Sequence, residues 1–353
     1  MAHSKLLWSA VWILLSFALV ACSPPDNQGE QERSAETEVE TTTWRFALEE
    51  IEGSVQDAYA QEFKRRIEAQ TDGAVQVEIY PYGSLGTSSQ ITEMLQSGAL
   101  ELAFASPGHL ADAIPEVGVF TLHFVLSDDD AVNRQALADP ELHALLQDPY
   151  LNQDLQLLAV VQEGWMVWSG NRPLRTPDDF ERFKIRTMTS PILVESYRAY
   201  GANPTPMPYG EVYSGLQLGQ IDGQVNPIFA IEEMSFYEEQ DYLTSGRHAQ
   251  FVTTLAASRS WFDGLDVETR TLVEQIRDDM VSWIDREQQR YNEERLEVIL
   301  AAGGTEWIEL TEAERQAFRD ASLGVRDTYV EQVGENGAKI LETLLALIEK
   351  HQS

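Results

Sequence analysis

The chain has 353 residues, of which 43% are hydrophobic and 9% aromatic, so it can fold around a substantial core and is not disordered as a whole. Its 25 Lys and Arg residues stand against 58 Asp and Glu residues, a formal net charge of −33. That balance excludes nucleic-acid binders, whose affinity comes from neutralising phosphates, and proteins that dock on anionic lipid through basic patches. A surface rich in carboxylates stays hydrated in concentrated salt, so the composition favours a protein that works in salty surroundings. The alternative is that the acidic surface serves solubility alone.

The N-terminus predicts export and a lipid anchor. Residues 6–20 form an apolar run that fits a signal-peptide core and is short for a bilayer span. Cys22 follows this run and is the only cysteine, so neither an intramolecular disulfide nor a cysteine-based metal cluster can form. A lone Cys in this place resembles the lipobox of bacterial lipoproteins. We therefore expect a lipoprotein-type signal peptide over 1–21; the alternative is an ordinary signal peptide that contains a Cys.

Residues 22–43 predict a disordered tether. The segment is rich in Pro, Glu, Ser and Thr and has no aromatic residue, so it cannot bury enough surface to fold. Such a segment spaces a folded body from its anchor. No later segment is apolar enough to span a membrane. We expect a soluble body outside the cytoplasm, tied to the membrane through a lipidated Cys22.

From residue 44 onward, predicted strands alternate with predicted helices. Ser54 caps a helix that ends near Gly73, and Thr87 with Gln90 forms a capping box for a second helix. The strands are expected at 44–48, 75–80, 100–105, 156–162, 165–169 and 184–188, and further helical segments at 128–150, from 176 and over 190–201. Strands that alternate with helices of roughly 10 to 15 residues indicate βαβ units and a mainly parallel sheet.

Residues 267–302 contain neither Gly nor Pro and predict one helix about 54 Å long at 1.5 Å per residue. Its apolar positions do not hold a strict heptad, which disfavours a coiled coil. A spine that runs along two domains fits better. Thr311 and Glu314 form another capping box, and two more helices complete the chain.

Motifs for catalysis, metal binding or cofactor binding are missing from the sequence. There is no G-x-S-x-G, no G-x-G-x-x-G and no phosphate loop. The six histidines are scattered, without an H-E-x-x-H or another i,i+4 pair that could hold a metal. We therefore expect no enzyme activity, no metal and no cofactor. A catalytic pair among the many carboxylates is the alternative that the motifs leave open.

Arg186 is the residue whose setting points to binding. It lies between Ile185 and a Thr-Met pair, and burying an Arg there is costly without an anionic partner. Its planar fork of donors suits a carboxylate held by two hydrogen bonds. That carboxylate can belong to a ligand or to one of the chain's own acids.

The chain from Trp44 to the C-terminus resembles the DctP-type solute-binding proteins of tripartite ATP-independent periplasmic (TRAP) transporters. The matching motifs are KIR at 184–186, GANPTP at 201–206, EVY at 211–213, GLQ at 215–217 and IDGQVNP at 221–227, with GSLG at 83–86 and SPG at 106–108. The resemblance implies an α/β, two-lobed periplasmic binding protein fold, with crossing strands and a long helix spanning both lobes. Lobe I would comprise 44–163 plus about 252–285, and lobe II 164–251 plus about 286–350.

The resemblance also implies where the ligand binds. Arg186 matches the arginine that clamps the ligand carboxylate in this family, and Asn226 matches the asparagine of the Q-x-N-P motif that hydrogen-bonds the same group. Many members carry a second arginine shortly after the first crossing strand, where this chain has GWMV at 164–167. That difference argues against a highly anionic ligand such as a dicarboxylate or a sugar acid.

Within the family, the chain is most similar to ectoine-binding members, at 44–50, 52–57, 186–189, 208–213 and 226–229. This likeness implies that Glu50 faces the cationic end of a zwitterion. Trp165, Tyr209, Phe229 and His109 are the further residues expected to line the cleft. His109, Tyr209 and Ala230 stand where large apolar aromatics are expected, and Trp165 where an acid is, so the ligand can be a relative of ectoine. From the residues alone, Glu50 can equally be an exposed acid, Trp165 a strand core residue and His109 a solvated loop histidine.

These expectations describe a periplasmic, lipid-anchored receptor without catalytic activity. It would capture a small organic acid or zwitterion between its lobes and deliver it to the small and large membrane subunits of a TRAP permease. Two other classes stay open at this stage: a secreted two-lobed enzyme, and the ligand-binding subunit of a sensory system.

Overall fold

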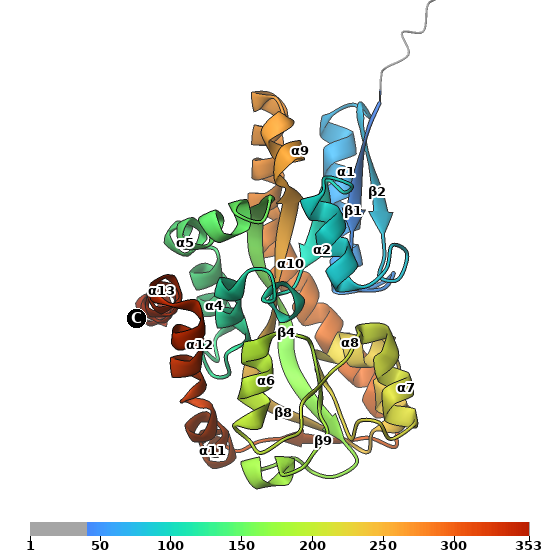
Figure 1. Ribbon diagram of the computed structural model, residues 1–353. Coiled ribbons are helices and arrows are strands. Elements are labelled where there is room, and N and C mark those ends of the chain that lie inside the picture. The colour runs from blue at the N-terminus through green and yellow to red at the C-terminus, as the bar shows by residue number, and fades with distance from the viewer. Residues whose placement is uncertain (1–40, 353) are drawn as a thin grey trace, which may run out of the picture. The chain divides into compact units, whose positions relative to one another are not determined.

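The computed structural model describes residues 41–352, the unit that Figure 1 draws in colour. The predicted signal peptide, Cys22 and most of the predicted tether lie outside the described residues. The strands are β1 (Thr42–Ala47), β2 (Val75–Tyr80), β3 (Leu102–Ala105), β4 (Leu155–Gly170), β5 (Arg186–Thr187), β6 (Thr205–Pro206), β7 (Val225–Asn226), β8 (Tyr242–Ser258) and β9 (Glu306–Glu309). The α-helices are α1 (Val55–Gln70), α2 (Ser88–Gln96), α3 (Pro107–Leu110), α4 (Asp130–Leu137), α5 (Pro140–Leu151), α6 (Pro191–Arg198), α7 (Val212–Gln217), α8 (Ile228–Glu233), α9 (Arg259–Gly264), α10 (Val267–Ala302), α11 (Glu312–Ser322), α12 (Val325–Val333) and α13 (Glu335–Gln352).

A mixed sheet runs through this unit in the order β2-β1-β3-β8-β4-β7, with β9 paired to β8. β1 is parallel to β2 and β3, whereas β8 is antiparallel to both β3 and β4. The prediction of a mainly parallel sheet is therefore wrong. The reason is the pair β4 and β8, strands of 16 and 17 residues that run antiparallel along their whole length.

The two long strands connect two α/β halves (Figure 1). One half holds β1, β2 and β3 with α1 and α2, and the other holds α6, α7 and α8 with the small β5–β6 sheet. Predicted strands 156–162 and 165–169 are parts of the single strand β4, which is interrupted by register shifts between Gln162 and Gly164 and between Trp165 and Val167. β4 therefore passes from one half into the other without a loop.

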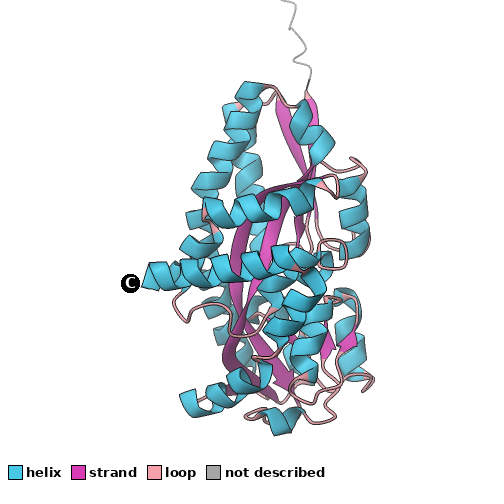
Figure 2. Ribbon diagram, turned by 60° about the vertical axis from the view of Figure 1, so that its left-hand side comes forward, coloured by secondary structure: helices cyan, strands magenta, loops and turns pink. Residues whose placement is uncertain are grey.

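Helices cover both sides of the sheet (Figure 2), and the alternation of side chains along the strands explains why. On β3, Leu102 and Phe104 point into a core shared with α1 and α10, whereas Ala103 and Ala105 point into a second core with α2 and α13. Large residues thus face one helical layer and small residues the other, as a period of two requires. A third core, rich in aromatic residues, lies in the second half around Trp168.

The long helix α10 has the predicted boundaries. The Asp266 side chain accepts a hydrogen bond from the Thr269 N–H at its start, and Gly303, with φ +74°, follows its end. It packs against α1 and β4 in one half and against α8 in the other. The capping boxes at Thr87 and Thr311 are confirmed as the starts of α2 and α11. None of the helices between residues 41 and 352 combines the length and apolarity that a bilayer span needs.

One local expectation is wrong. The segment from Thr176 forms only a short 3-10 helix (Pro177–Phe180), because its capping box is followed by a turn at Glu181. After β3, Ser106 precedes the short helix α3. Proline at the first helical position fits that start.

Candidate functional site

A cavity lies where the two halves meet. Its free volume is ≈ 360 Å³, part of which is open to solvent. It is lined by Glu49, Glu50, Ser88, Ser106, His109, Arg186, Met188, Tyr209, Asn226, Ala230 and Phe251. The loop that follows β1, the start of α2, and Ser106 and His109 at α3 supply the residues of one half. Arg186, Asn226 and Ala230 come from β5, β7 and α8. Five of the seven predicted ligand-binding residues are thus brought together.

Arg186 reaches this cavity from β5 and is 1% exposed. Its Nε and Nη2 donate hydrogen bonds to the Met207 carbonyl oxygen over 2.9 and 2.8 Å. Among residues 41–352, no carboxylate forms an ion pair with it, so the structural ion pair that the sequence left open is not formed there. Burial lowers the pKa of Arg186 to about 10, and the guanidinium stays charged at neutral pH. A buried cation without an anion of its own carries a desolvation cost that nothing in the described residues compensates by ion pairing.

Asn226 lies on β7, which pairs with the crossing strand β4 at Val167. Its side-chain Nδ2 donates to Gln224 Oε1 over 2.5 Å, Gln224 Nε2 donates to Ser169 Oγ over 3.0 Å, and Ser169 Oγ donates to Gln240 Oε1 over 2.7 Å. This buried relay fixes the orientation of the Asn226 amide at the cavity wall.

Glu49 and Glu50 follow β1 and are 6% and 4% exposed, so Glu50 is not an exposed acid. Glu49 Oε2 accepts a hydrogen bond from the Ser106 N–H over 2.6 Å, and Glu50 Oε2 accepts one from the Gln56 N–H over 3.1 Å. Burial raises the pKa of Glu49 to about 7 and also raises the pKa of Glu50. Neither has a cationic partner among the described residues. Two acids therefore share the cavity with one Arg.

His109 and Tyr209 complete the predicted part of the lining. Burial, and secondarily the charge of Arg186, lowers the pKa of His109 to about 3, so its ring is neutral. The Tyr209 hydroxyl donates a hydrogen bond to Glu233 Oε1 over 3.0 Å. The Tyr209 ring packs edge to face against the Tyr82 ring, with the centroids 5.6 Å apart. Both residues offer neutral, partly aromatic surface to a ligand.

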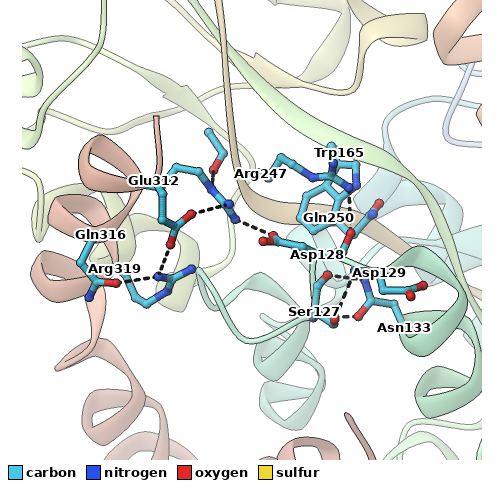
Figure 3. A network of polar contacts seen from close by, with 12 residues as sticks. Ser127, Asp128, Asp129, Asn133, Trp165, Arg247, Gln250, Glu312, Gln316 and Arg319 are labelled. Atoms are coloured by element: carbon cyan, nitrogen blue, oxygen red, sulfur yellow. Dashed lines mark hydrogen bonds and ion pairs between the residues drawn. The ribbon is translucent and has the colours of Figure 1, made fainter. Parts of the chain in front are cut away.

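Trp165 and Phe229 do not line this cavity. Trp165 Nε1 donates to Asp130 Oδ1 over 3.0 Å, and the Arg247 guanidinium lies 4.7 Å from the centroid of its ring (Figure 3). Trp165 instead borders a separate opening beside α10. Phe229 is 1% exposed and packs in the first core, whereas its neighbour Ala230 faces the cavity.

Sequence reasoning missed several lining residues. Glu49 directly precedes Glu50, and Ser106 belongs to the SPG motif, so both had a signal in the sequence. Phe251 comes from β8, whose place in the sheet depends on pairing with distant residues. Ser88 carries no local mark of function. Met188 lies in the 186–189 segment that is similar to ectoine-binding members, but a methionine there is equally typical of a core residue.

Comparisons with known proteins agree with this architecture. The profile of the bacterial extracellular solute-binding proteins, family 7 (DctP), matches residues 46–332. The chain is 38% identical over 312 residues to the ectoine-binding periplasmic protein TeaA of Halomonas elongata, covering 88% of this chain and 91% of that protein. It is 37% identical over 318 residues to the ectoine/5-hydroxyectoine-binding periplasmic protein UehA of Ruegeria pomeroyi, covering 89% and 92%.

Solved structures give the same result. An open, ligand-free TRAP periplasmic solute-binding protein of Marinobacter aquaeolei VT8 is 48% identical, with a TM-score of 0.82 over 86% of this chain and 99% of the other. The ectoine-binding protein of the TeaABC TRAP transporter of Halomonas elongata is 36% identical, with a TM-score of 0.85 over 88% and 100%. These relatives are periplasmic binding proteins and not enzymes, so the enzymatic and sensory alternatives gain no support. The chain belongs to family 7 of the bacterial extracellular solute-binding proteins and is a periplasmic solute receptor of the TRAP type.

Proposed function

We propose that this receptor captures a compact zwitterion of the ectoine type. Arg186 and Asn226 would hold its carboxylate, Glu50 would receive its cationic end, and the loaded protein would deliver it to the small and large permease subunits. One observation carries the proposal. The cavity holds the buried guanidinium of Arg186, which has no carboxylate partner among the described residues, and the buried carboxyl groups of Glu49 and Glu50, which have no cationic partner there. The ligands named for the relatives, ectoine and 5-hydroxyectoine, have this chemistry and support the proposal.

Counting charges favours a zwitterion over a dicarboxylate. Among residues 41–352, Arg186 is the one cation that lines the cavity, so the second carboxylate of a dicarboxylate would be unpaired beside Glu49 and Glu50. An unpaired charge in a closed cleft costs several kcal/mol. A zwitterion satisfies both signs, and the rings of Tyr209 and Phe251 would add about 0.5–2 kcal/mol of attraction for a delocalised cation.

A ligand panel tests the proposal. Thermal unfolding and titration calorimetry would compare ectoine and 5-hydroxyectoine with succinate, malate and sialic acid. A cognate ligand at 100 times its Kd is expected to add about 2.7 kcal/mol of stability. Stabilisation by the dicarboxylates alone would contradict the zwitterion, although the transport role would stand.

We also propose the lobe boundaries implied by the family resemblance, with lobe I at 44–163 plus about 252–285 and lobe II at 164–251 plus about 286–350. Two of the three register shifts of β4 lie around Gly164 and support a boundary at that point. Bulges bend a strand and leave its ladder locally unpaired, which suits a place where two bodies move against each other. The ligand would then bind between the lobes, within the cavity described above.

We propose further that the mature chain starts at Cys22 and is held at the membrane by acyl groups on that residue. Two or more acyl chains bind a bilayer far more firmly than one, since each buried methylene contributes about 0.8 kcal/mol. Cys22→Ala is expected to move the protein from the membrane fraction to the soluble fraction without changing ligand affinity. Wild-type protein that fails to incorporate labelled fatty acid would contradict the anchor.

A further inference from the structure

Glu163 is a buried carboxyl group that the proposed ligand contacts leave unused. It lies on β4 next to Gly164, is 1% exposed and does not line the cavity. Its Oε1 accepts a hydrogen bond from Gln56 Nε2 over 3.3 Å, and its Oε2 has no N–H or hydroxyl donor. Burying a carboxylate oxygen without a donor is costly, and a proton on that oxygen removes the cost.

The partner for that proton is Glu50. Gln56 is hydrogen-bonded to both acids: its backbone N–H donates to Glu50 Oε2, and its side-chain Nε2 donates to Glu163 Oε1. Both carboxyl groups are buried beside the same Gln56, and a hydrogen bond between them requires a proton on one of them. Burial raises the pKa of both groups, and the charge of Glu50 raises that of Glu163 further. Glu50 Oε2 accepts a hydrogen bond from the Gln56 N–H whereas Glu163 Oε2 has no donor, so Glu163 is the acid that needs the proton.

No basic side chain of residues 41–352 forms an ion pair with either acid. The other titratable or charged groups around them are Glu49 beside β1, His109 on α3, Arg186 on β5, Tyr209 before α7, Glu233 on α8 and Arg295 on α10. Arg295 faces Glu233 and pairs with Glu232 at 3.3 Å. From α1, the neighbours are the neutral Ser54 and Gln56.

We propose that Glu163 is a positioning residue for the cationic end of the ligand: as a neutral acid it donates a hydrogen bond to Glu50 and keeps that carboxylate oriented and ionised. This inference rests on the proposed function, because it gives Glu50 the role of receiving a cation. It adds a specificity-determining residue that does not touch the ligand. On this proposal, ligand affinity depends on a hydrogen-bond donor in the side chain at position 163 and not on a negative charge there.

Two substitutions distinguish the effect of the hydrogen-bond donor of Glu163 from the effect of its side-chain volume. Glu163→Gln keeps an oxygen that can accept from Gln56 and an N–H that can donate to Glu50, so its affinity for ectoine is expected within about 3-fold of wild type. Glu163→Leu has a similar size and no donor. Loss of a hydrogen bond to a charged group is expected to weaken binding by roughly 10- to 100-fold.

The pH dependence of affinity distinguishes positioning from packing. Glu50 must be ionised to receive a cation, so affinity falls as pH falls through its pKa. Without the donor, the pKa of Glu50 rises because burial is no longer offset. Calorimetric titration of ectoine between pH 5 and 8 gives the affinity at each pH. The loss of affinity on the acid side (the acid limb) should lie at higher pH in E163L than in wild type and should be unchanged in E163Q. Glu49 is present in all three proteins, so its titration is common to them.

Infrared spectroscopy tests the proton in the wild type, even if E163L does not fold. A neutral carboxylic acid has its own carbonyl stretch, so the wild-type minus E163Q difference spectrum at pH 7 should contain that band, free of the contributions of Glu49 and Glu233 that both proteins share. The absence of that band, or acid limbs that coincide in wild type and E163L, overturns the inference while zwitterion binding stands. A wild type that binds neither ectoine nor 5-hydroxyectoine overturns the proposed function, and the role of Glu163 with it.

Discussion

At Arg186, the fold holds a charge that its own chain does not neutralise. Burial lowers the pKa of this guanidinium from 12.5 to about 10, so keeping it ionised at neutral pH costs the ligand-free fold about 3 kcal/mol. The hydrogen bonds to Met207 recover only part of that cost. Under the proposed function, a ligand carboxylate would supply the missing partner, and the unfavourable burial would thereby become binding energy.

Replacing Arg186 with Met separates binding from stability. Arg186→Met is expected to weaken ectoine binding by about 2–5 kcal/mol, whereas Arg186→Lys should recover only part of the loss because it lacks the planar fork. The ligand-free protein should stay within about 1–2 kcal/mol of wild type in urea unfolding, because relief of the buried charge offsets the Met207 carbonyl left without a donor. Lys184→Met is the matched control, since Lys184 is exposed and pairs with Asp222. Wild-type affinity in folded Arg186→Met would show that the carboxylate binds elsewhere.

Glu49 should make the ligand-free fold depend on pH. Its folded pKa is about 7 against an ordinary 4.5, so above pH 4.5 the unfolded chain releases a proton that the folded protein still holds. The free energy of unfolding therefore falls as pH rises from 4.5 to 7, by about 3 kcal/mol from this residue. Glu49→Gln can still accept from the Ser106 N–H and should reduce the difference between pH 5 and pH 8 by that amount. The free energy of unfolding of both proteins would be measured by urea unfolding across this pH range. Curves that run parallel would contradict the raised pKa of Glu49.

At the scale of elements, the sequence predicts what is locally determined. Helix α10 is confirmed at its predicted boundaries, because Asp266, Gly303 and the lack of Gly and Pro between them are local signals. Strand β8 and the antiparallel direction of β4 could not be predicted, because their pairing joins residues as far apart as Leu155 and Ser258. Gly164 looks like a strand end in the sequence but has φ +138° inside β4.

The same reasoning explains the candidate site. The residues that meet as expected, Glu50, His109, Arg186, Tyr209 and Asn226, lie on motif segments with short-range structure of their own. Trp165 follows the register shift at Gly164, and an extra residue in a strand changes which face later side chains take. Its side chain therefore meets Asp130 and Arg247 and not the cavity. No alternation rule applied to the sequence reveals such a shift.

Gly164 is the position at which β4 should be least tolerant of a side chain. A Cβ there would lie 2.4 Å from Asn292 Nδ2, which donates to the Glu163 carbonyl over 2.9 Å. Gly164→Ala is expected to lower the free energy of unfolding by about 2–4 kcal/mol, through backbone strain and displacement of Asn292. Gly53→Ala is the control, because Gly53 also has a positive φ but no atom within 4 Å of its Cβ position. It should cost only about 1–2 kcal/mol. Equal losses in urea unfolding would mean that Asn292 moves freely.

For the whole molecule, the net charge of −33 acts on folding and on ligand choice at once. Surface acids repel one another and oppose the compact state, and they also repel free anions from the cleft. A zwitterion has no net charge, so this field neither attracts nor repels it at long range. An acidic receptor therefore suits a ligand whose two charges are recognised only inside the cavity.

Salt should consequently change stability and affinity by different amounts. The screening length falls from about 30 Å at 0.01 M to about 3 Å at 1 M salt, so the Tm of the ligand-free protein is expected to rise by several degrees over that range of NaCl. Contacts inside the cavity are screened much less, and ectoine affinity should change by less than about 3-fold. KCl should act like NaCl, because screening depends on ionic strength and not on the cation. A Tm that stays constant would mean that the acidic surface does not destabilise the fold, and an affinity that falls steeply with salt would mean that the ligand is bound as an ion of net charge.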